Sequence, residues 1–109
     1  MGKRFRLVLT TAGSEEQAVT IARGLVERRL AACVNVVANA CSIYRWKGEI
    51  VEEDEKLLLI KTEQRLLPRL REAIGELHSY EVPELIALPI EDGDPEYLSW
   101  LEACLKEED

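Results

Sequence analysis

The chain has 109 residues, of which 47% are apolar and 32% are charged, and its formal net charge is −7. This length is typical of one domain, and an acidic balance argues against nucleic-acid binding, which usually needs a basic surface. No apolar run is long enough for a membrane span, and Met1–Phe5 lack the apolar core of a signal peptide. We therefore expect one domain over residues 1–109, located in the cytoplasm, with no nucleic-acid or membrane partner.

The first third of the chain predicts a strand followed by a helix. Residues 5–11 are a short β-branched and apolar run, which is typical of a strand. Ser14 is placed to cap a helix, and Gln17 completes a capping box. Apolar residues then recur at helical spacing, so we expect the helix to have one apolar face and to end near residues 30–32.

A long β-hairpin is predicted next, with Lys47-Gly48 as its two-residue turn. Its first arm runs through residues 34–46, rich in β-branched and aromatic residues. Its second arm contains four consecutive apolar residues, 57–60, which suit a strand covered on both faces. The acidic run 52–55 could open a helix on propensity alone, but the first arm needs a partner. The turn predicts four facing pairs: Trp46 with Glu49, Tyr44 with Val51, Ala38 with Leu57, and Val36 with Leu59.

This hairpin is too long for the domain that carries it. Each arm of some 14 residues spans roughly 46 Å at the usual strand rise. A compact chain of this length has a radius of gyration near ~13 Å, which gives a body about 34 Å across. The apolar residues at the tip would be left in water in a monomer, and exposed apolar tips and open edges are hazards unless another chain covers them. The hairpin therefore predicts an oligomer.

The rest of the chain predicts a helix, a strand and a final helix. Residues 62–64 are expected to start the second helix, with Pro68 in its first turn. Residues 84–90 suit a strand, in which Pro89 requires an edge or an end. Asp94 followed by Pro95 is a strong helix start, and the inward positions of that helix are expected to be Tyr97, Leu98, Leu101, Cys104 and Leu105.

The predicted order is β-α-β-β-α-β-α. Interleaved strands and helices with one central hairpin indicate an α+β, ferredoxin-like (split βαβ) sandwich, with both main helices on one face of the sheet. The long hairpin and the C-terminal helix are additions to that plan.

Metal-binding chemistry has only scattered candidate residues. The sequence contains three cysteines and one histidine, and no CxxC, HxxxH or HExxH motif. Cys33, Cys41 and His78 could converge in space, and such ligands suit copper. The alternative is that the thiols are small buried hydrophobes and that His78 caps helix carbonyls.

The densest polar and aromatic segment is the loop 78–84, of sequence HSYEVPE. It could line a pocket, or it could be a proline-set turn whose tyrosine packs on the core. The acidic run 52–55 lacks the spacing of an EF-hand and is better explained as a solvated hairpin edge. Phosphate-binding glycine patterns are absent from the sequence.

Five segments stand out, in order along nearly the whole chain. They are ERRLAACVN at 27–35, SIYRWKGEI at 42–50, LLIKT at 58–62, HSYEVPE at 78–84 and YLSWL at 97–101. Together they resemble the CutA divalent-cation tolerance proteins. Ser79 departs from the family pattern, which usually has proline there, and the departure bears on the rigidity of that loop rather than on the resemblance as a whole.

The resemblance implies a ferredoxin-like fold and a homotrimer built by strand pairing between subunits, with an architecture related to PII signalling proteins. It implies a role in tolerance of divalent metals, copper above all, with no established enzymatic reaction. We expect no required cofactor, and copper or another divalent cation is the candidate ligand. The shared residues expected near the subunit clefts are Tyr44, Trp46, Lys61, Tyr80 and Glu84, with Cys33 and His78 as the metal ligands.

Two functional hypotheses follow. In the first, the chain is a trimeric, non-catalytic protein of metal homeostasis that binds metal ions, chiefly copper; Cys33 and His78 favour it. In the second, it is a PII-like trimeric sensor or scaffold that binds a small anionic metabolite; Lys61 favours it, because an ammonium group in a cleft suits an anion.

Overall fold

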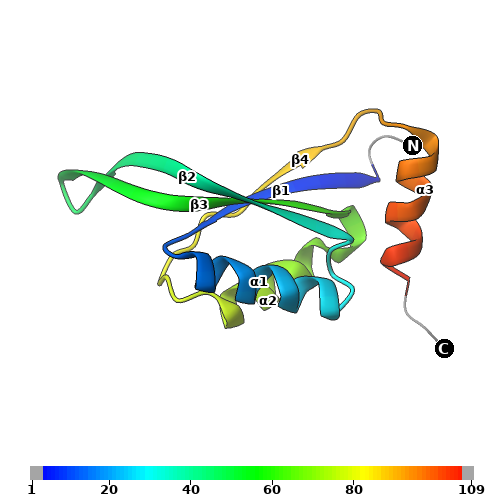
Figure 1. Cartoon of the computed structure of the whole chain (residues 1–109), viewed down its shortest axis with the longest axis horizontal. Coiled ribbons are helices and arrows are strands. Elements are labelled where there is room, and N and C mark those ends of the chain that lie inside the picture. The colour runs from blue at the N-terminus through cyan, green and yellow to red at the C-terminus, as the bar shows by residue number, and fades with distance from the viewer. Residues whose placement is uncertain (1–3, 107–109) are drawn as a thin grey trace.

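A computed structural model describes residues 4–106 and contains one four-stranded antiparallel sheet (Figure 1). The sheet order is β2-β3-β1-β4, in which the two central strands each pair on both sides. The expectation of a cytoplasmic location used residues 1–5, and residues 1–3 lie outside the described range. The strands are β1 Phe5–Ala12, β2 Cys33–Trp46, β3 Glu49–Glu63 and β4 Ile86–Pro89.

Two helices cover one face of this sheet, and a third stands at its end (Figure 1). They are α1 Glu15–Glu27, α2 Leu67–Leu77 and α3 Pro95–Cys104, and the short 3-10 helix Gln64–Leu66 precedes α2. The sheet order and the one-sided helix layer confirm the ferredoxin-like prediction, with the long hairpin and the C-terminal helix as its additions. Within residues 4–106, no helix has the length and apolar content needed to cross a membrane.

The core lies between the sheet and the α1–α2 layer. Alternate residues of the central strands, such as Val8, Leu58 and Ile60, face the helices and are fully buried. They pack against the apolar faces of the helices, including Ile21 and Leu70. Burying an aliphatic side chain of this size contributes about 1.5–3 kcal/mol, so this layer supplies most of the stability of the chain.

Helix α1 begins as predicted but ends earlier. Ser14 Oγ accepts a 3.1 Å hydrogen bond from the Gln17 backbone N–H, which is the capping interaction expected. The Gln17 side chain does not close the box, because its Nε2 donates to the Leu77 carbonyl at 2.9 Å. The expected end near residues 30–32 was wrong: Arg29 has φ 56°, which breaks the helix, and the backbone N–H of Leu30 bonds Leu25 O.

The second helix starts later than predicted. Thr62 and Glu63 complete β3, where the Thr62 hydroxyl donates to the Leu30 carbonyl at 2.7 Å. The buried Glu63 carboxylate accepts from both Arg4 and Arg65, which fixes the strand end. Helix α2 therefore begins at Leu67, and Pro68 lies in its first turn as predicted.

The C-terminal part agrees with the prediction except at two places. Strand β4 is the sheet edge, as Pro89 required, but Glu84 and Leu85 precede it rather than belong to it. Asp94 caps α3 by accepting from the Tyr97 N–H at 3.1 Å. Tyr97 was expected to face inward and is 43% exposed, because α3 stands at the end of the sheet and buries a narrower stripe.

The outer half of the hairpin has the predicted register, and the inner half does not. Trp46 pairs with Glu49 and Tyr44 with Val51, as the Lys47-Gly48 turn requires. A β-bulge follows, since two residues, Ala38 and Asn39, lie opposite the single residue Lys56. The predicted pairs further in were therefore wrong by one position: Leu57 pairs with Val37 instead of Ala38, and Val36 pairs with Leu58 instead of Leu59.

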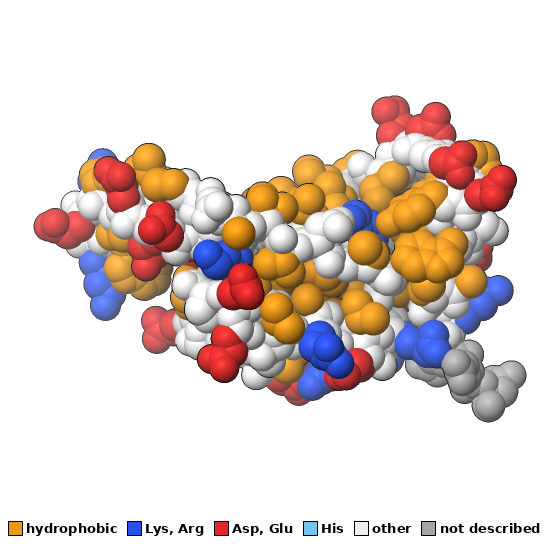
Figure 2. Space-filling view, in the orientation of Figure 1, with side chains coloured by type: hydrophobic (Ala, Val, Ile, Leu, Met, Phe, Trp, Pro, Cys, Tyr) orange, Lys and Arg blue, Asp and Glu red, His pale blue; other side chains and the backbone are white. Residues whose placement is uncertain are grey.

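One face of the sheet has no helix layer. Partners in an antiparallel ladder share a face, so this face carries the residues that alternate with the core positions. Figure 2 shows apolar side chains gathered along the sheet and around α3. The overall dimensions are 46 × 28 × 23 Å, and the hairpin projects along the longest of them (Figure 1). The apolar residues on the open face include Leu7, Leu9, Leu57, Leu59, Ile86 and Leu88.

Candidate functional site

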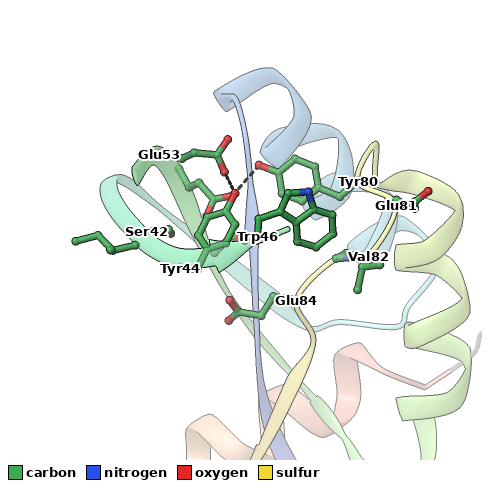
Figure 3. Close-up of a pocket in the computed structure, with 12 residues that line it drawn as sticks. Ser42, Tyr44, Trp46, Glu53, Tyr80, Glu81, Val82 and Glu84 are labelled. Atoms are coloured by element: carbon green, nitrogen blue, oxygen red, sulfur yellow. Dashed lines mark hydrogen bonds between the residues drawn. The ribbon is translucent and has the colours of Figure 1, made fainter. Parts of the chain in front are cut away.

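A cavity of about 620 Å³ lies where the projecting half of the hairpin leaves the body (Figure 3). The hairpin forms one wall and the loop between α2 and β4 forms the other. Its described lining residues are Thr11, Ser42, Ile43, Tyr44, Trp46, Glu53, Glu55, Tyr80, Glu81, Val82, Pro83 and Glu84.

Strand alternation explains how the hairpin wall is built. Ser42, Tyr44 and Trp46 are two residues apart, so they project from the same face of β2. Glu53 pairs with Ser42 and therefore shares that face from β3, and Glu55 follows two residues later. The β-bulge lies just inside these pairs and keeps this set on the face that has no helix layer.

The loop wall is held by the single histidine. His78 is buried, and its Nε2 lies 2.6 Å from the Thr11 carbonyl oxygen. Its Nδ1 accepts a 3.1 Å hydrogen bond from the Tyr80 backbone N–H, so Nε2 carries the proton and donates to Thr11. The His78 and Tyr80 rings are 4.5 Å apart. The imidazole thus fixes the conformation that presents Tyr80 to the cavity.

Two tyrosine–glutamate pairs line the cavity, one between its two walls and one within the hairpin wall. The Tyr80 hydroxyl donates a 2.6 Å hydrogen bond to Glu55 Oε2, and the Tyr44 hydroxyl donates to Glu53 (Figure 3). Burial and the bond to Glu55 raise the pKa of Tyr80 above its usual value of 10. The hydrogen bond to Glu53 raises the pKa of Tyr44 to about 12. Both phenols therefore remain protonated donors near neutral pH.

The electrostatic character of the cavity is acidic. Glu53, Glu55, Glu81 and Glu84 line it, and none of the described lining residues is Lys, Arg or His. In Figure 3 the Glu84 side chain lies below Tyr44 and Trp46, whereas the Glu81 carboxyl group is directed away from the rings. Carboxylates that line a partly enclosed cavity attract cations and repel anions.

The structure brings four of the expected cleft residues together: Tyr44, Trp46, Tyr80 and Glu84 line this one cavity. The fifth, Lys61, lies six residues from Glu55 along β3, which is roughly 20 Å at the usual strand rise. Its ammonium group bonds the side-chain oxygen of Asn35 and lies 3.9 Å from Cys33 Sγ.

The two expected metal ligands, Cys33 and His78, are not neighbours. Cys33 pairs with Lys61 at the start of β2, whereas His78 contacts Thr11 and Tyr80 behind the cavity. Among residues 4–106, no group of three or more His, Cys, Asp and Glu side chains is arranged to hold a metal ion.

Sequence reasoning missed Glu53 and Glu55, which it assigned to a solvated hairpin edge. Glu55 is in fact only 5% exposed. The signal that could have found both residues was their alternation along the strand, which decides the face of the sheet on which each side chain lies. They share the face of Tyr44 and Trp46 once the turn fixes the register, whereas Glu52 and Asp54 point to the other face.

The sheet order and the one-sided helix layer define an α+β protein of the ferredoxin-like class, here with an acidic, aromatic cavity beside its hairpin. The family model for the CutA1 divalent ion tolerance protein matches residues 6–104. The chain belongs to that family, and the resemblance noted in the sequence is confirmed.

Relatives in this family are similar over most of the chain. The divalent-cation tolerance protein CutA of Thermus thermophilus is 58% identical over 95 residues, covering 87% of this chain and 92% of that protein. Protein CutA of Mus musculus is 52% identical over 84% of this chain, which spans 51% of the mouse protein. The crystal structure of CutA1 from Oryza sativa superposes with a TM-score of 0.92 at 39% identity, covering 96% of both chains.

Proposed function

We propose that this chain is a trimeric, non-catalytic protein of divalent metal tolerance that binds metal ions, chiefly copper, at or near its subunit clefts. Membership of a divalent ion tolerance family supplies the metal-related role. The observation that carries cation binding is the cavity, which is lined by four glutamates and, among the described residues, by no basic side chain.

Assembly is supported by the surfaces left uncovered in a single chain. The open sheet face is apolar, with Ile86 and Leu88 half-exposed, and Ile50 at the hairpin tip is 62% exposed. Strand β2 also has an unpaired outer edge of 14 residues. Exposed edges and apolar patches of this kind are usually covered by another chain. Because the family resemblance implies a homotrimer, we propose that two further copies of this chain cover them.

Cys33 and His78 remain the proposed metal ligands, with unequal support. The Cys33 thiol is half-buried beside the Lys61 ammonium, and sulfur is a ligand that Cu(I) prefers. His78 would have to give up its bonds to Thr11 and Tyr80 to bind Cu(II). The cavity glutamates supply a weaker, carboxylate-based alternative for a divalent ion.

An anionic metabolite has less support than a metal ion. Lys61, the residue that favoured it, lies away from the cavity and bonds Asn35. We also propose a cytoplasmic location, although relatives include a chloroplastic CutA of Arabidopsis thaliana.

Native mass spectrometry of protein purified without added metal tests assembly and retained ligand together. We expect three 12.4 kDa chains per particle, and copper titration calorimetry should show binding that weakens in Glu53→Gln/Glu84→Gln or in Cys33→Ser. The matched control is Glu52→Gln, an exposed acid that does not line the cavity. A monomer, or copper binding equal in all variants, would contradict the proposal.

A further inference from the structure

The cavity contains more aromatic surface than a metal ion requires. The rings of Tyr44, Trp46 and Tyr80 come from two separate segments and gather at one place (Figure 3). A divalent ion is held by oxygen, nitrogen or sulfur atoms at about 2 Å, and aromatic faces contribute nothing to that coordination. A volume of about 620 Å³ instead lies in the range of sites for small organic molecules.

Among the described residues that line the cavity, none is a cationic partner for the buried carboxylate of Glu55. Glu55 is 5% exposed, and the hydrogen bond that the structure gives it comes from the neutral Tyr80 hydroxyl. No described lining residue carries a positive charge. Burying a charge is costly unless an opposite charge or several donors compensate it. The missing positive charge is what a ligand could supply.

We propose that this cavity binds a small organic cation, with its ammonium head group among the rings of Tyr44, Trp46 and Tyr80 and close to Glu55. The ring faces attract a cation through their quadrupoles, most strongly at tryptophan, and the carboxylates add direct attraction. The apolar part of the ligand contacts Val82 and Pro83 on the loop wall. An anion is repelled, and a neutral apolar molecule leaves Glu55 uncompensated.

This inference names a ligand class for the cavity on which the proposed cation binding rests, but it does not depend on metal binding. Copper uses carboxylate or thiolate atoms, whereas an organic cation uses the rings. Replacing Cys33, which does not line the cavity, by serine therefore separates the two: it should weaken Cu(I) binding and leave organic-cation binding unchanged.

The test is an NMR titration of the full-length protein, in its native assembly, with tetramethylammonium chloride at constant ionic strength. The probe signals are the indole N–H of Trp46 and the backbone N–H of Tyr80, which Trp46→Leu retains, and the indole of Trp100 on α3 serves as the internal control. We expect a saturable shift of the two cavity signals and no shift of the Trp100 signal. The neutral compound tert-butanol, of similar size, should not produce it at the same concentration.

Variants then separate charge from shape. Glu55→Gln keeps an acceptor for Tyr80 and removes the charge, and we expect affinity to fall at least threefold; Trp46→Leu should do the same. Glu52→Gln and Trp100→Leu, outside the cavity, should leave affinity unchanged. If Glu55→Gln fails to fold, the Trp46 and Trp100 pair decides. The proposal is overturned if tetramethylammonium gives no saturable shift, if tert-butanol matches it, or if Trp46→Leu binds like wild type.

Discussion

The hydroxyl of Tyr80 donates a 2.6 Å hydrogen bond to Glu55, 25 residues earlier in the chain. This bond joins the loop after α2 to the base of the projecting hairpin. Because the Tyr80 backbone is in turn fixed by His78, the two walls of the cavity are held at one separation. Hydrogen bonds therefore fix the shape of the cavity, and its two walls are not independent segments.

Tyr80→Phe should destabilise the protein by about 2 kcal/mol, because it leaves a buried charged acceptor without its donor. Chemical denaturation at fixed chain concentration measures the change. Tyr44→Phe is the matched control: its partner Glu53 is exposed, so its loss should be clearly smaller. Equal losses in the two variants would show that the Tyr80–Glu55 bond contributes no more than a surface contact.

Alkaline pH should destabilise the fold through its tyrosines. The pKa values of Tyr44, Tyr80 and Tyr97 are all raised. For Tyr44 the hydrogen bond to Glu53 raises the pKa to about 12, and for Tyr80 and Tyr97 the main cause is burial. A raised pKa means that the folded chain keeps these phenol protons to a higher pH than the unfolded chain does. The contribution to stability is therefore complete below pH 10 and is lost as pH rises through about 12.

Ultraviolet titration of tyrosinate checks this prediction. The native protein should ionise its tyrosines later than the same chain in denaturant, and unfolding free energy should decline from about pH 10 upward. In Tyr80→Phe the decline should be shallower. Tyrosine titration near 10 in the native protein would contradict the hydrogen-bonded pairs described here.

The bulge makes a prediction about Asn39, whose φ is 64°. Asparagine tolerates this left-handed conformation, whereas a β-branched side chain is strained there by about 1–2 kcal/mol. Asn39→Val should lower the melting temperature, and Asn39→Gly should leave it nearly unchanged. The control is Ala38→Val, at the adjacent bulge residue, which has no positive φ. Similar melting of the two valine variants would contradict the strain argument.

The open sheet face predicts how assembly can be disrupted. Leu88, on this face, and Val19, on α1, have nearly equal exposures of 43% and 41%. We expect Leu88→Glu to reduce the particle mass measured by light scattering on dilution, because a charge would be buried between chains. Val19→Glu should retain the wild-type mass. If both variants keep that mass, the open face is not the interface.

Much of the fold could be predicted because its signals are local. The Lys47-Gly48 turn, the Asp94-Pro95 helix start and the edge position of Pro89 each depend on a few neighbouring residues, and all three were confirmed. The bulge was not predicted, since Asn39 lies in an otherwise regular strand run. The late start of α2 was also missed, because it depends on Glu63 contacting Arg4 from the other end of the chain.

The candidate site was predicted only in part, for a related reason. The motifs indicated which residues matter, and four of them, including Tyr44 and Tyr80, do line one cavity. They carried no information on distance along a strand, and within one chain Lys61 lies roughly 20 Å along β3 from Glu55. Glu55 was taken for a surface acid, because its burial depends on Tyr80, which follows it by 25 residues.

The bulge at Ala38-Asn39 also sets the direction in which the outer half of the hairpin projects, because it bends the strand at the base of that half. Seven residues, 40–46, separate it from the Lys47-Gly48 turn. The distance is roughly 26 Å, so a change of about 10° in the bend there would move the tip by about 4–5 Å. Deleting Asn39 would restore an unbroken ladder and leave Tyr44 and Trp46 on their present face. The projecting half of the hairpin would nevertheless take a new direction relative to the Tyr80 loop. The direction of the hairpin is therefore set by one inserted residue that does not itself line the cavity.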